Sequence, residues 1–155
     1  FRNVLSIFLN RMLLKKPAII YGDGSQKRCF SYVDDCITCI EETIENTKTS
    51  KEIINIGPDE EFISIKDLAD KCANATGFNT QHIYHKARPQ EVKFATCSSN
   101  KARKLLGYKT KFSLDKSIEL TCEYIKRRGP KDFNYQIDLE IVNEKTPKTW
   151  KNKLI

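Results

Sequence analysis

Apolar residues recur at helical spacing in five stretches of the chain, which predicts five helices. The first covers the first fifteen residues and ends before Pro17, which cannot continue a helix. The others are predicted over Tyr32–Asn46, from Ser64 to Gly77, from Ser98 or Ser99 to Gly107, and from Ser113 to Gly129. Asp34 or Asp35 caps the second helix or adds charge to its start, and Asp67 completes an approximate capping box with Ser64.

Short extended segments separate these helices. Strands are predicted at Ala18–Tyr21 and His82–His85, an extended segment at Arg28–Tyr32, and a compact buried strand at Ile53–Ile56, which ends at Gly57-Pro58. Two or three short strands do not make a self-sufficient sheet. We therefore expect Ile53–Ile56 to be built for pairing with strands that this chain lacks.

The regular pattern stops near Pro130. We assign residues 1–130 to one domain and residues 131–155 to a C-terminal tail. The tail has scattered apolar anchors at Phe133, Tyr135, Ile137, Leu139, Ile141 and Trp150. No internal repeat is visible.

Length and composition fit one globular domain. The chain has 155 residues, 39% hydrophobic and 30% charged, with a net charge of +7. The lysines are scattered among acidic residues and no nucleic-acid motif is present, so we do not predict nucleic-acid binding. No apolar run has the length of a membrane span, and we predict no membrane contact. Reduced cysteines are typical of the cytoplasm, which is the predicted location.

Six cysteines occur at irregular spacing, and only Cys36 and Cys39 form a C-x-x-C. Both fall on one face of a predicted helix beside Ile40 and Ile44, which core packing explains. No second cysteine pair or histidine pair completes a zinc site, so we predict no metal. His82 and His85 are three residues apart in a strand and point to opposite faces, which favours structural or surface roles.

Two arginines are candidates for binding a phosphorylated ligand. Arg28 follows the turn Gly22-Asp23-Gly24, and its guanidinium offers the rigid fork of donors that suits a diphosphate. Arg88 precedes Pro89 and is therefore extended, while Glu91 can accept hydrogen bonds from ribose hydroxyls. The alternatives are a surface salt bridge for Arg28 and an internal Arg88–Glu91 ion pair.

Two further sets are candidates for the wall of a base-binding site. Asn3 and Val4 begin the first helix, and Ile19 and Tyr21 belong to the first strand. Aromatic and apolar faces stack against a base, and backbone groups read its edge. Plain core packing is the alternative for Ile19 and Tyr21.

The stretch from Tyr21 to Asp35, YGDGSQKRCFSYVDD, closely resembles a signature of NAD-dependent nucleotide-sugar epimerases and dehydratases, in the extended short-chain dehydrogenase/reductase family. Four later stretches resemble family motifs in the same order. They are Ile54–Gly57, Ile63–Ala69, Arg88–Tyr108 and Ser113–Ile118. Cys29 and Glu91 stand where Asp is frequent in the family, and Ser6 stands where Pro is common, which bears on the identity of the sugar nucleotide.

The resemblance implies roles for the candidate residues. Asn3 and Val4 would line the base and diphosphate side of the nucleotide, and Ile19 and Tyr21 would contact the base. Arg28 and Arg88 would hold the diphosphate of a UDP- or dTDP-sugar, and Glu91 would take the ribose hydroxyls. NAD is the implied cofactor.

The resemblance also implies a fold. This would be a mostly helical α+β fold, consisting of the C-terminal substrate-binding lobe plus the last strand, Ile54–Ile56, and last helix of the Rossmann sheet. No G-x-x-G-x-x-G and no Tyr-x-x-x-Lys occurs in the chain, since Tyr124 is followed four places later by Arg128. We therefore expect a truncated chain that starts at Phe1, lacks the N-terminal NAD-binding part and is inactive alone.

Three hypotheses remain open. The chain is the substrate-binding part of a truncated enzyme, a stand-alone nucleotide-binding module, or a partner that completes a separate NAD-binding chain. The expected partners are a nucleoside-diphosphate sugar and either the missing NAD-binding half or a second copy, through exposed surface. The sequence does not distinguish epimerase, dehydratase and decarboxylase.

Overall fold

A computed structural model describes residues 3–79, 81–132, 142–146 and 151–153. In chain order the elements are α1 (Val4–Leu13), β1 (Ile19–Tyr21), β2 (Lys27–Arg28), α2 (Val33–Glu45), the 3-10 turn η1 (Thr47–Thr49), β3 (Ile63–Ser64), α3 (Ile65–Thr76), β4 (Ile83–His85), β5 (Phe94–Ala95), α4 (Asn100–Leu106) and α5 (Leu114–Arg128). The predicted tail anchors lie outside the described residues. Within the described residues the chain is a small α/β domain with five α-helices and only short strands.

The ends of the helices follow the sequence signals. Ser64 caps α3 by accepting from the backbone N–H of Asp67, and its hydroxyl donates back to the Asp67 carboxylate at 2.6 Å, which confirms the capping box. Gly77 and Gly107 end α3 and α4 in the left-handed conformation. At α2, Asp34 and Asp35 place charge in the first turn, but Tyr32 is the N-cap and makes no side-chain capping bond.

The strands form two small sheets. β1 pairs in parallel with β4, and the three-stranded sheet has the order β3-β2-β5, with β2 antiparallel to β3 and parallel to β5. β3 and β5 were not predicted, because a two-residue strand has no detectable alternation. The second extended segment lies earlier than predicted, since β2 covers Lys27–Arg28.

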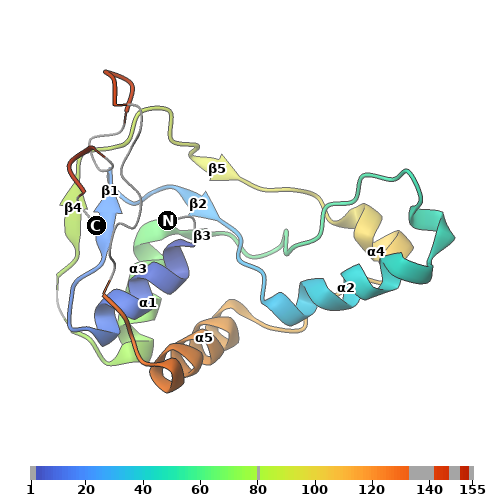
Figure 1. Ribbon diagram of the computed structural model, residues 1–155, viewed down its shortest axis with the longest axis horizontal. Coiled ribbons are helices and arrows are strands. Elements are labelled where there is room, and N and C mark those ends of the chain that lie inside the picture. The colour runs from blue at the N-terminus through green and yellow to red at the C-terminus, as the bar shows by residue number, and fades with distance from the viewer. Residues whose placement is uncertain (1–2, 80, 133–141, 147–150, 154–155) are drawn as a thin grey trace.

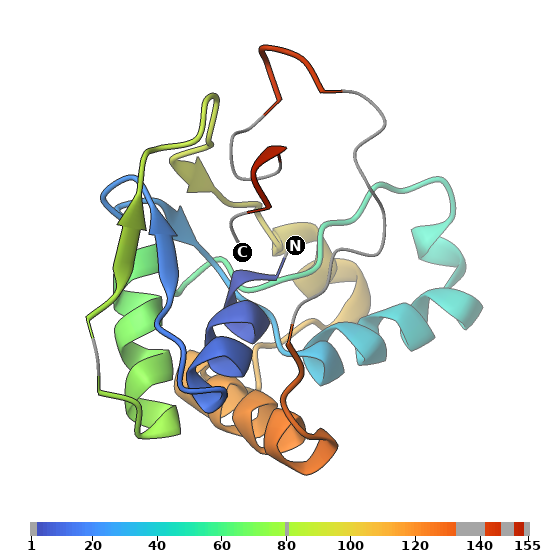
Figure 2. The same cartoon turned by 60° about the vertical axis from the view of Figure 1, so that its left-hand side comes forward.

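The larger hydrophobic core lies where α1, α3 and α5 pack together beside β1 (Figures 1 and 2). Phe8, Leu9, Ile20 and Leu68 are fully or almost fully buried there. A second, smaller core joins Cys39 of α2 to Ala102 and Leu106 of α4, with Tyr108 beside them. In Figure 1, α2 and α4 form the right-hand part of the molecule, away from the three-helix core.

The prediction of a buried strand at Ile53–Ile56 is wrong for this chain. No strand is assigned there, and Ile53 is 86% exposed. Ile54 and Ile56 are partly buried against the smaller core. A strand needs hydrogen-bonded neighbours, and the described strands pair elsewhere, which leaves this segment without a ladder.

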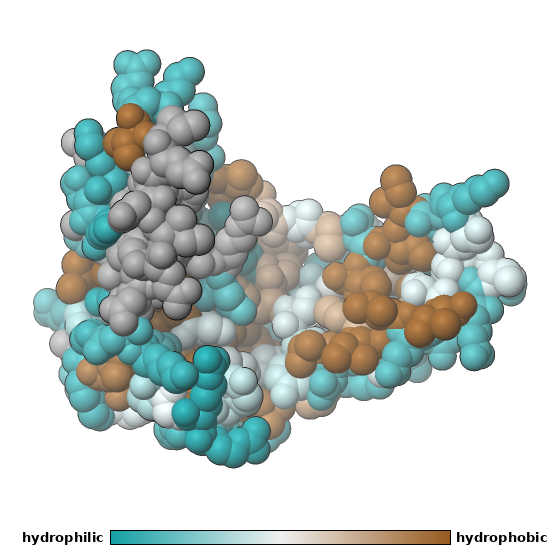
Figure 3. All heavy atoms as spheres, in the orientation of Figure 1, coloured by the Kyte–Doolittle hydropathy of each residue, from teal (hydrophilic) through white to brown (hydrophobic). Residues whose placement is uncertain are grey.

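The apolar face of α2 is largely exposed, so core packing explains only part of the C-x-x-C and its apolar neighbours. Cys39 is buried, but Cys36 is only partly buried, and Ile37, Ile40 and Ile44 are exposed. Figure 3 shows hydrophobic side chains gathered over this right-hand part of the molecule. Burying the rest of this face would require contacts beyond those within the described residues.

Candidate functional site

The turn after β1 is held in one conformation by glycine and by an aspartate. Gly24 has a φ of 76°, and a Cβ on it would lie 3.0 Å from the Cβ of Lys66. Ser25 donates its backbone N–H and its hydroxyl to Asp23 at 2.9 and 2.7 Å, and these bonds lower the pKa of the Asp23 carboxyl. The conformation of this turn therefore fixes the position of β2 and of Arg28 within it.

Residues 19–28 and 83–95 run side by side in the same direction. Besides the two parallel strand pairs, the backbone N–H of Gly22 donates to the carbonyl of His85 at 2.9 Å, and that of Lys27 to Lys93 at 2.8 Å. Four residues predicted to contact the ligand therefore lie on two neighbouring segments: Tyr21 and Arg28 on one, and Arg88 and Glu91 on the other.

Tyr21 is buried and already in contact with two side chains of the neighbouring segment. The guanidinium carbon of Arg88 lies 4.2 Å from the centroid of the Tyr21 ring, and the His85 ring stacks on it with centroids 5.8 Å apart. In this structure Tyr21 packs against other side chains, which is the alternative given for it above. Its contact with a nucleotide base stays a prediction. His85 was not predicted at this site, and the parallel register places it directly opposite Tyr21.

Arg88 and Glu91 are brought together by a tight turn. Pro89 and Gln90 are its central residues, and Gln90 has a φ of 59°, as the third residue of a type II turn does. The Nε of Arg88 lies 3.6 Å from Oε2 of Glu91. This is the internal ion pair that sequence analysis gave as the alternative to ligand binding.

The Arg88–Glu91 pair is incomplete as a hydrogen bond. Its separation of 3.6 Å exceeds the usual hydrogen-bond range. Both atoms are covered from solvent, and neither has a hydrogen-bond partner among the described residues. Buried polar atoms are normally satisfied, so these two retain unused bonding capacity.

Arg28 makes no ion pair with any described residue, so the surface salt bridge considered for it is absent there. Its guanidinium donates to the backbone carbonyls of Lys27 at 2.8 Å and Val92 at 2.7 Å, with a longer contact of 3.4 Å to Lys93. Arg28 therefore ties β2 to the segment that follows Glu91.

The remaining predicted contacts lie on other elements. Asn3 is the N-cap of α1, and its side-chain oxygen accepts from the N–H of Ser6 at 3.4 Å. Val4 is half-buried against the larger core, and Ile19 is half-buried at the start of β1. No hydrogen bond or ion pair joins these three side chains to Arg28 or Arg88 among the described residues.

Redox and metal chemistry have little support in the described part of the chain. No cluster of three or more potential metal-binding side chains occurs there. Burial, with nearby Cys97 as the next cause, raises the pKa of the Cys29 thiol and so disfavours the reactive thiolate. No helix of the described residues is long and apolar enough to cross a membrane.

The sequence matches the family model described as GDP-mannose 4,6 dehydratase over residues 2–121. Two curated relatives are a putative UDP-glucose 4-epimerase of Methanocaldococcus jannaschii, 34% identical over 81% of this chain and 40% of the relative, and a UDP-glucuronate 4-epimerase of Thermodesulfobacterium geofontis, 30% identical over 77% and 36%. The chain thus spans about two fifths of the length of these relatives.

Solved structures agree with the sequence comparisons. UDP-glucose 4-epimerase of Thermotoga maritima, solved with UDP-glucose, superposes with a TM-score of 0.76 at 29% identity, over 81% of this chain and 40% of that one. UDP-glucuronic acid 4-epimerase of Bacillus cereus, solved with UDP-glucuronic acid and NAD, gives a TM-score of 0.75 at 33% identity, over 83% and 41%.

NAD is the cofactor of the family, since solved relatives contain NAD or NADH. The residues of this chain do not fit it, because the sequence contains no Gly-rich loop that would accept the pyrophosphate of a dinucleotide. The matched residues, the identities and the fold together show that the chain belongs to the NAD-dependent nucleotide-sugar epimerases and dehydratases of the extended short-chain dehydrogenase/reductase family.

Proposed function

We propose that this chain is the substrate-binding portion of an NAD-dependent nucleotide-sugar epimerase or dehydratase and clamps the nucleoside diphosphate of a UDP- or dTDP-sugar. Arg28 and Arg88 hold the diphosphate, and Glu91 accepts from the ribose hydroxyls. Ile19 and Tyr21 face the base, and Asn3 and Val4 line its approach. Relatives solved with UDP-glucose or UDP-glucuronic acid support this class of ligand.

One observation supports the clamp above the others. Nε of Arg88 and Oε2 of Glu91 are buried and without hydrogen-bond partners among the described residues, yet lie 3.6 Å apart. A diphosphate supplies acceptors for the guanidinium, and a ribose supplies donors for the carboxylate. Charge-assisted hydrogen bonds of this kind are roughly twice as strong as neutral ones, so exchange of the long internal pair for ligand contacts is favourable.

Arg28 reaches the same ligand from the opposite segment. It already bonds Val92, one residue after Glu91, so both guanidinium groups flank one short stretch of backbone. An arginine has five N–H donors. Arg28 therefore keeps donors for a phosphate oxygen while it holds the carbonyl groups.

Calorimetric titration of the chain with UDP, dTDP and inorganic phosphate tests the clamp. We expect both nucleotides to bind more tightly than phosphate, and Arg88→Gln to cost about 1.5–3 kcal/mol of the nucleotide affinity, the range for a charged hydrogen bond. Arg127→Gln, on α5, removes the same charge away from the clamp and is the matched control. Equal affinity for UDP and phosphate, or equal losses in the two variants, would refute the clamp.

Catalysis requires residues that this chain does not contain. We infer that the chain alone turns over no nucleotide sugar, because it has neither the Gly-rich loop nor a Tyr-x-x-x-Lys. The exposed apolar face of α2, with Ile37, Ile40 and Ile44, then packs against an NAD-binding half. Epimerase activity of the purified chain, surviving removal of trace enzymes, would contradict this proposal.

The alternative is a binding module without catalysis that acts alone or completes a separate NAD-binding chain. Mixing this chain with a separately produced NAD-binding half distinguishes the possibilities. Recovery of epimerisation in the mixture supports completion, and nucleotide binding without any recovery supports the stand-alone module.

A further inference from the structure

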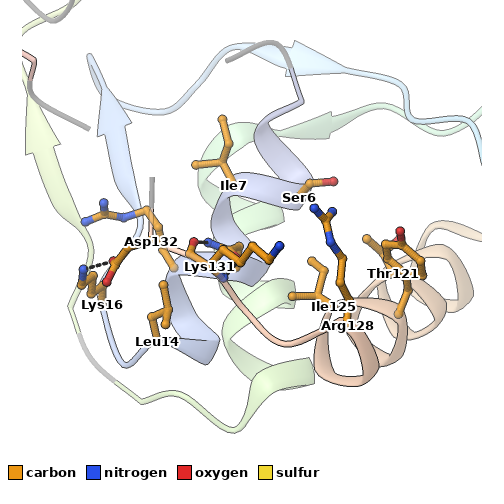
Figure 4. Close-up of a pocket in the computed structure, with 12 residues that line it drawn as sticks. Ser6, Ile7, Leu14, Lys16, Thr121, Ile125, Arg128, Lys131 and Asp132 are labelled. Carbon is orange, nitrogen blue, oxygen red and sulfur yellow. Dashed lines mark hydrogen bonds and ion pairs between the residues drawn. The ribbon is translucent and has the colours of Figure 1, made fainter. Parts of the chain in front are cut away.

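A hollow in the molecule lies between α1 and α5, outside the proposed clamp. Its volume is about 430 Å³, within the range of small-molecule sites, and residues 131–132 close one end of it (Figure 4). None of Ile19, Tyr21, Arg28, Arg88 and Glu91 lines this cavity. A ligand bound here would be separate from the nucleotide.

The cavity is lined mainly by cationic side chains, with apolar side chains beside them. Four cationic side chains line the cavity with a single carboxylate, that of Asp132. Asp132 is already paired with Lys16, and Arg11 donates to the carbonyl of Pro17 at 2.8 Å. The other two cations, Arg128 and Lys131, have no ion-pair partner among the described residues.

The backbone at Lys131 is held in place beside the cavity. The side-chain amide of Asn10 donates to the carbonyl of Lys131 at 2.7 Å and accepts from its N–H at 3.0 Å. The adjacent Lys16–Asp132 ion pair fixes the next residue. Lys131 is therefore positioned by two contacts that do not use its own ammonium group.

The two unpaired cations converge. In Figure 4 the side chain of Lys131 extends toward that of Arg128, whose guanidinium reaches toward Ser6 on α1. Like charges repel at short distance, and an anion between them removes that repulsion. Ile7 of α1 and Ile125 of α5 lie beside the same space and offer an apolar surface.

We propose that this cavity binds a phosphate monoester with a compact apolar body. The phosphate lies between Arg128 and Lys131, which combine a planar fork and a compact ammonium, both suited to phosphate oxygens. The apolar body lies on Ile7 and Ile125. The Ser6 hydroxyl, which also lines the cavity, donates to the phosphate as a neutral group.

Phenyl phosphate is the probe, titrated into the chain by calorimetry with amide chemical shifts recorded in parallel. We expect shifts concentrated on α1 and α5, and Arg128→Gln and Lys131→Gln each to weaken binding by about tenfold or more, the loss expected for one charge-assisted hydrogen bond. Lys126→Gln removes the same charge from α5 outside the cavity and should change affinity by less than about twofold.

Three results would overturn the proposal. Equal weakening by Lys126→Gln and Arg128→Gln would show that only net charge attracts the probe. Binding abolished by Arg28→Gln but kept in Arg128→Gln would place the probe in the nucleotide clamp instead. Inorganic phosphate that binds as tightly as phenyl phosphate would show that the apolar surface takes no part. Thermal unfolding of each variant verifies that lost binding is not lost folding.

Discussion

Replacement of Gln90 by glycine should stabilise the chain, although it removes a side chain beside the proposed clamp. Gln90 has a φ of 59°, in the left-handed region. A residue with a Cβ pays about 1–2 kcal/mol there, and glycine does not. The Gln90 side chain is exposed and makes no hydrogen bond with any described residue, so its removal costs no contact of that kind.

The opposing effect comes from the unfolded chain. Glycine gains about 0.5–1 kcal/mol more backbone entropy on unfolding than a residue with a side chain. Subtracting this from the relieved strain leaves a net stabilisation of about 0–1.5 kcal/mol for Gln90→Gly, centred on about 0.75 kcal/mol. Urea unfolding followed by circular dichroism measures a change of this size through the midpoint at constant slope.

Two control variants separate conformation from side-chain loss. Gln90→Ala keeps the left-handed strain and should change stability by less than about 0.5 kcal/mol. Lys86→Gly, in the same exposed segment but not at a positive φ, should lose about 0.5–1 kcal/mol. If Gln90→Gly destabilises the chain as much as Lys86→Gly does, the turn does not hold Gln90 in the left-handed region and this reasoning is wrong.

Three further predictions address other parts of the molecule. Ile44→Lys on the exposed face of α2 should reduce self-association in light scattering and leave the unfolding midpoint nearly unchanged; a wild-type chain that is strictly monomeric at high concentration would argue against a sticky α2 face. The Arg103 guanidinium lowers the pKa of Asp59 from 3.8 to about 2, so the stabilisation from this pair is complete above pH 4 and is lost as the pH falls through 2. Asp59→Asn should therefore flatten the decline of stability between pH 4 and 2, and an unchanged decline would rule out this pair as its source. Burial raises the pKa of Cys72 to about 12, so at pH 8 iodoacetamide should modify the partly exposed Cys97 well before Cys72, and equal rates would mean that the core opens readily.

Local sequence signals predicted most of the helix ends, because the capping residues lie within the helix or beside it. Ser64 and Ser113 cap two helices with their hydroxyl groups, and Gly77 and Gly107 mark two C-termini. These signals act within one turn of helix and need no distant partner. The same holds for the turn at Gly22–Gly24, whose glycines have positive φ.

Long-range pairing could not be predicted in the same way. β3 and β5 are strands because both pair with β2, which lies between them. A two-residue sequence does not indicate which distant strand it pairs with. The position of His85 beside Tyr21 also depends on long-range pairing, since the register of β4 against β1 places the two residues opposite each other. Asp35 is another case: its buried carboxylate accepts from the N–H groups of Lys111 and Phe112, more than seventy residues away.

The failed strand at Ile53–Ile56 and the exposed face of α2 have one physical explanation. Both segments have apolar side chains suited to burial, and both contact the small core built on Cys39 and Ala102 through only some of them. Apolar side chains stay exposed in this way when the surface that would cover them does not belong to the described residues. This chain covers about 40% of the length of the relatives, and under the proposed function the NAD-binding half supplies that surface. The helix pairs of the larger core need no such partner, so the proposed clamp, which β1 and β4 attach to that core, is the part of the chain most able to bind a ligand alone.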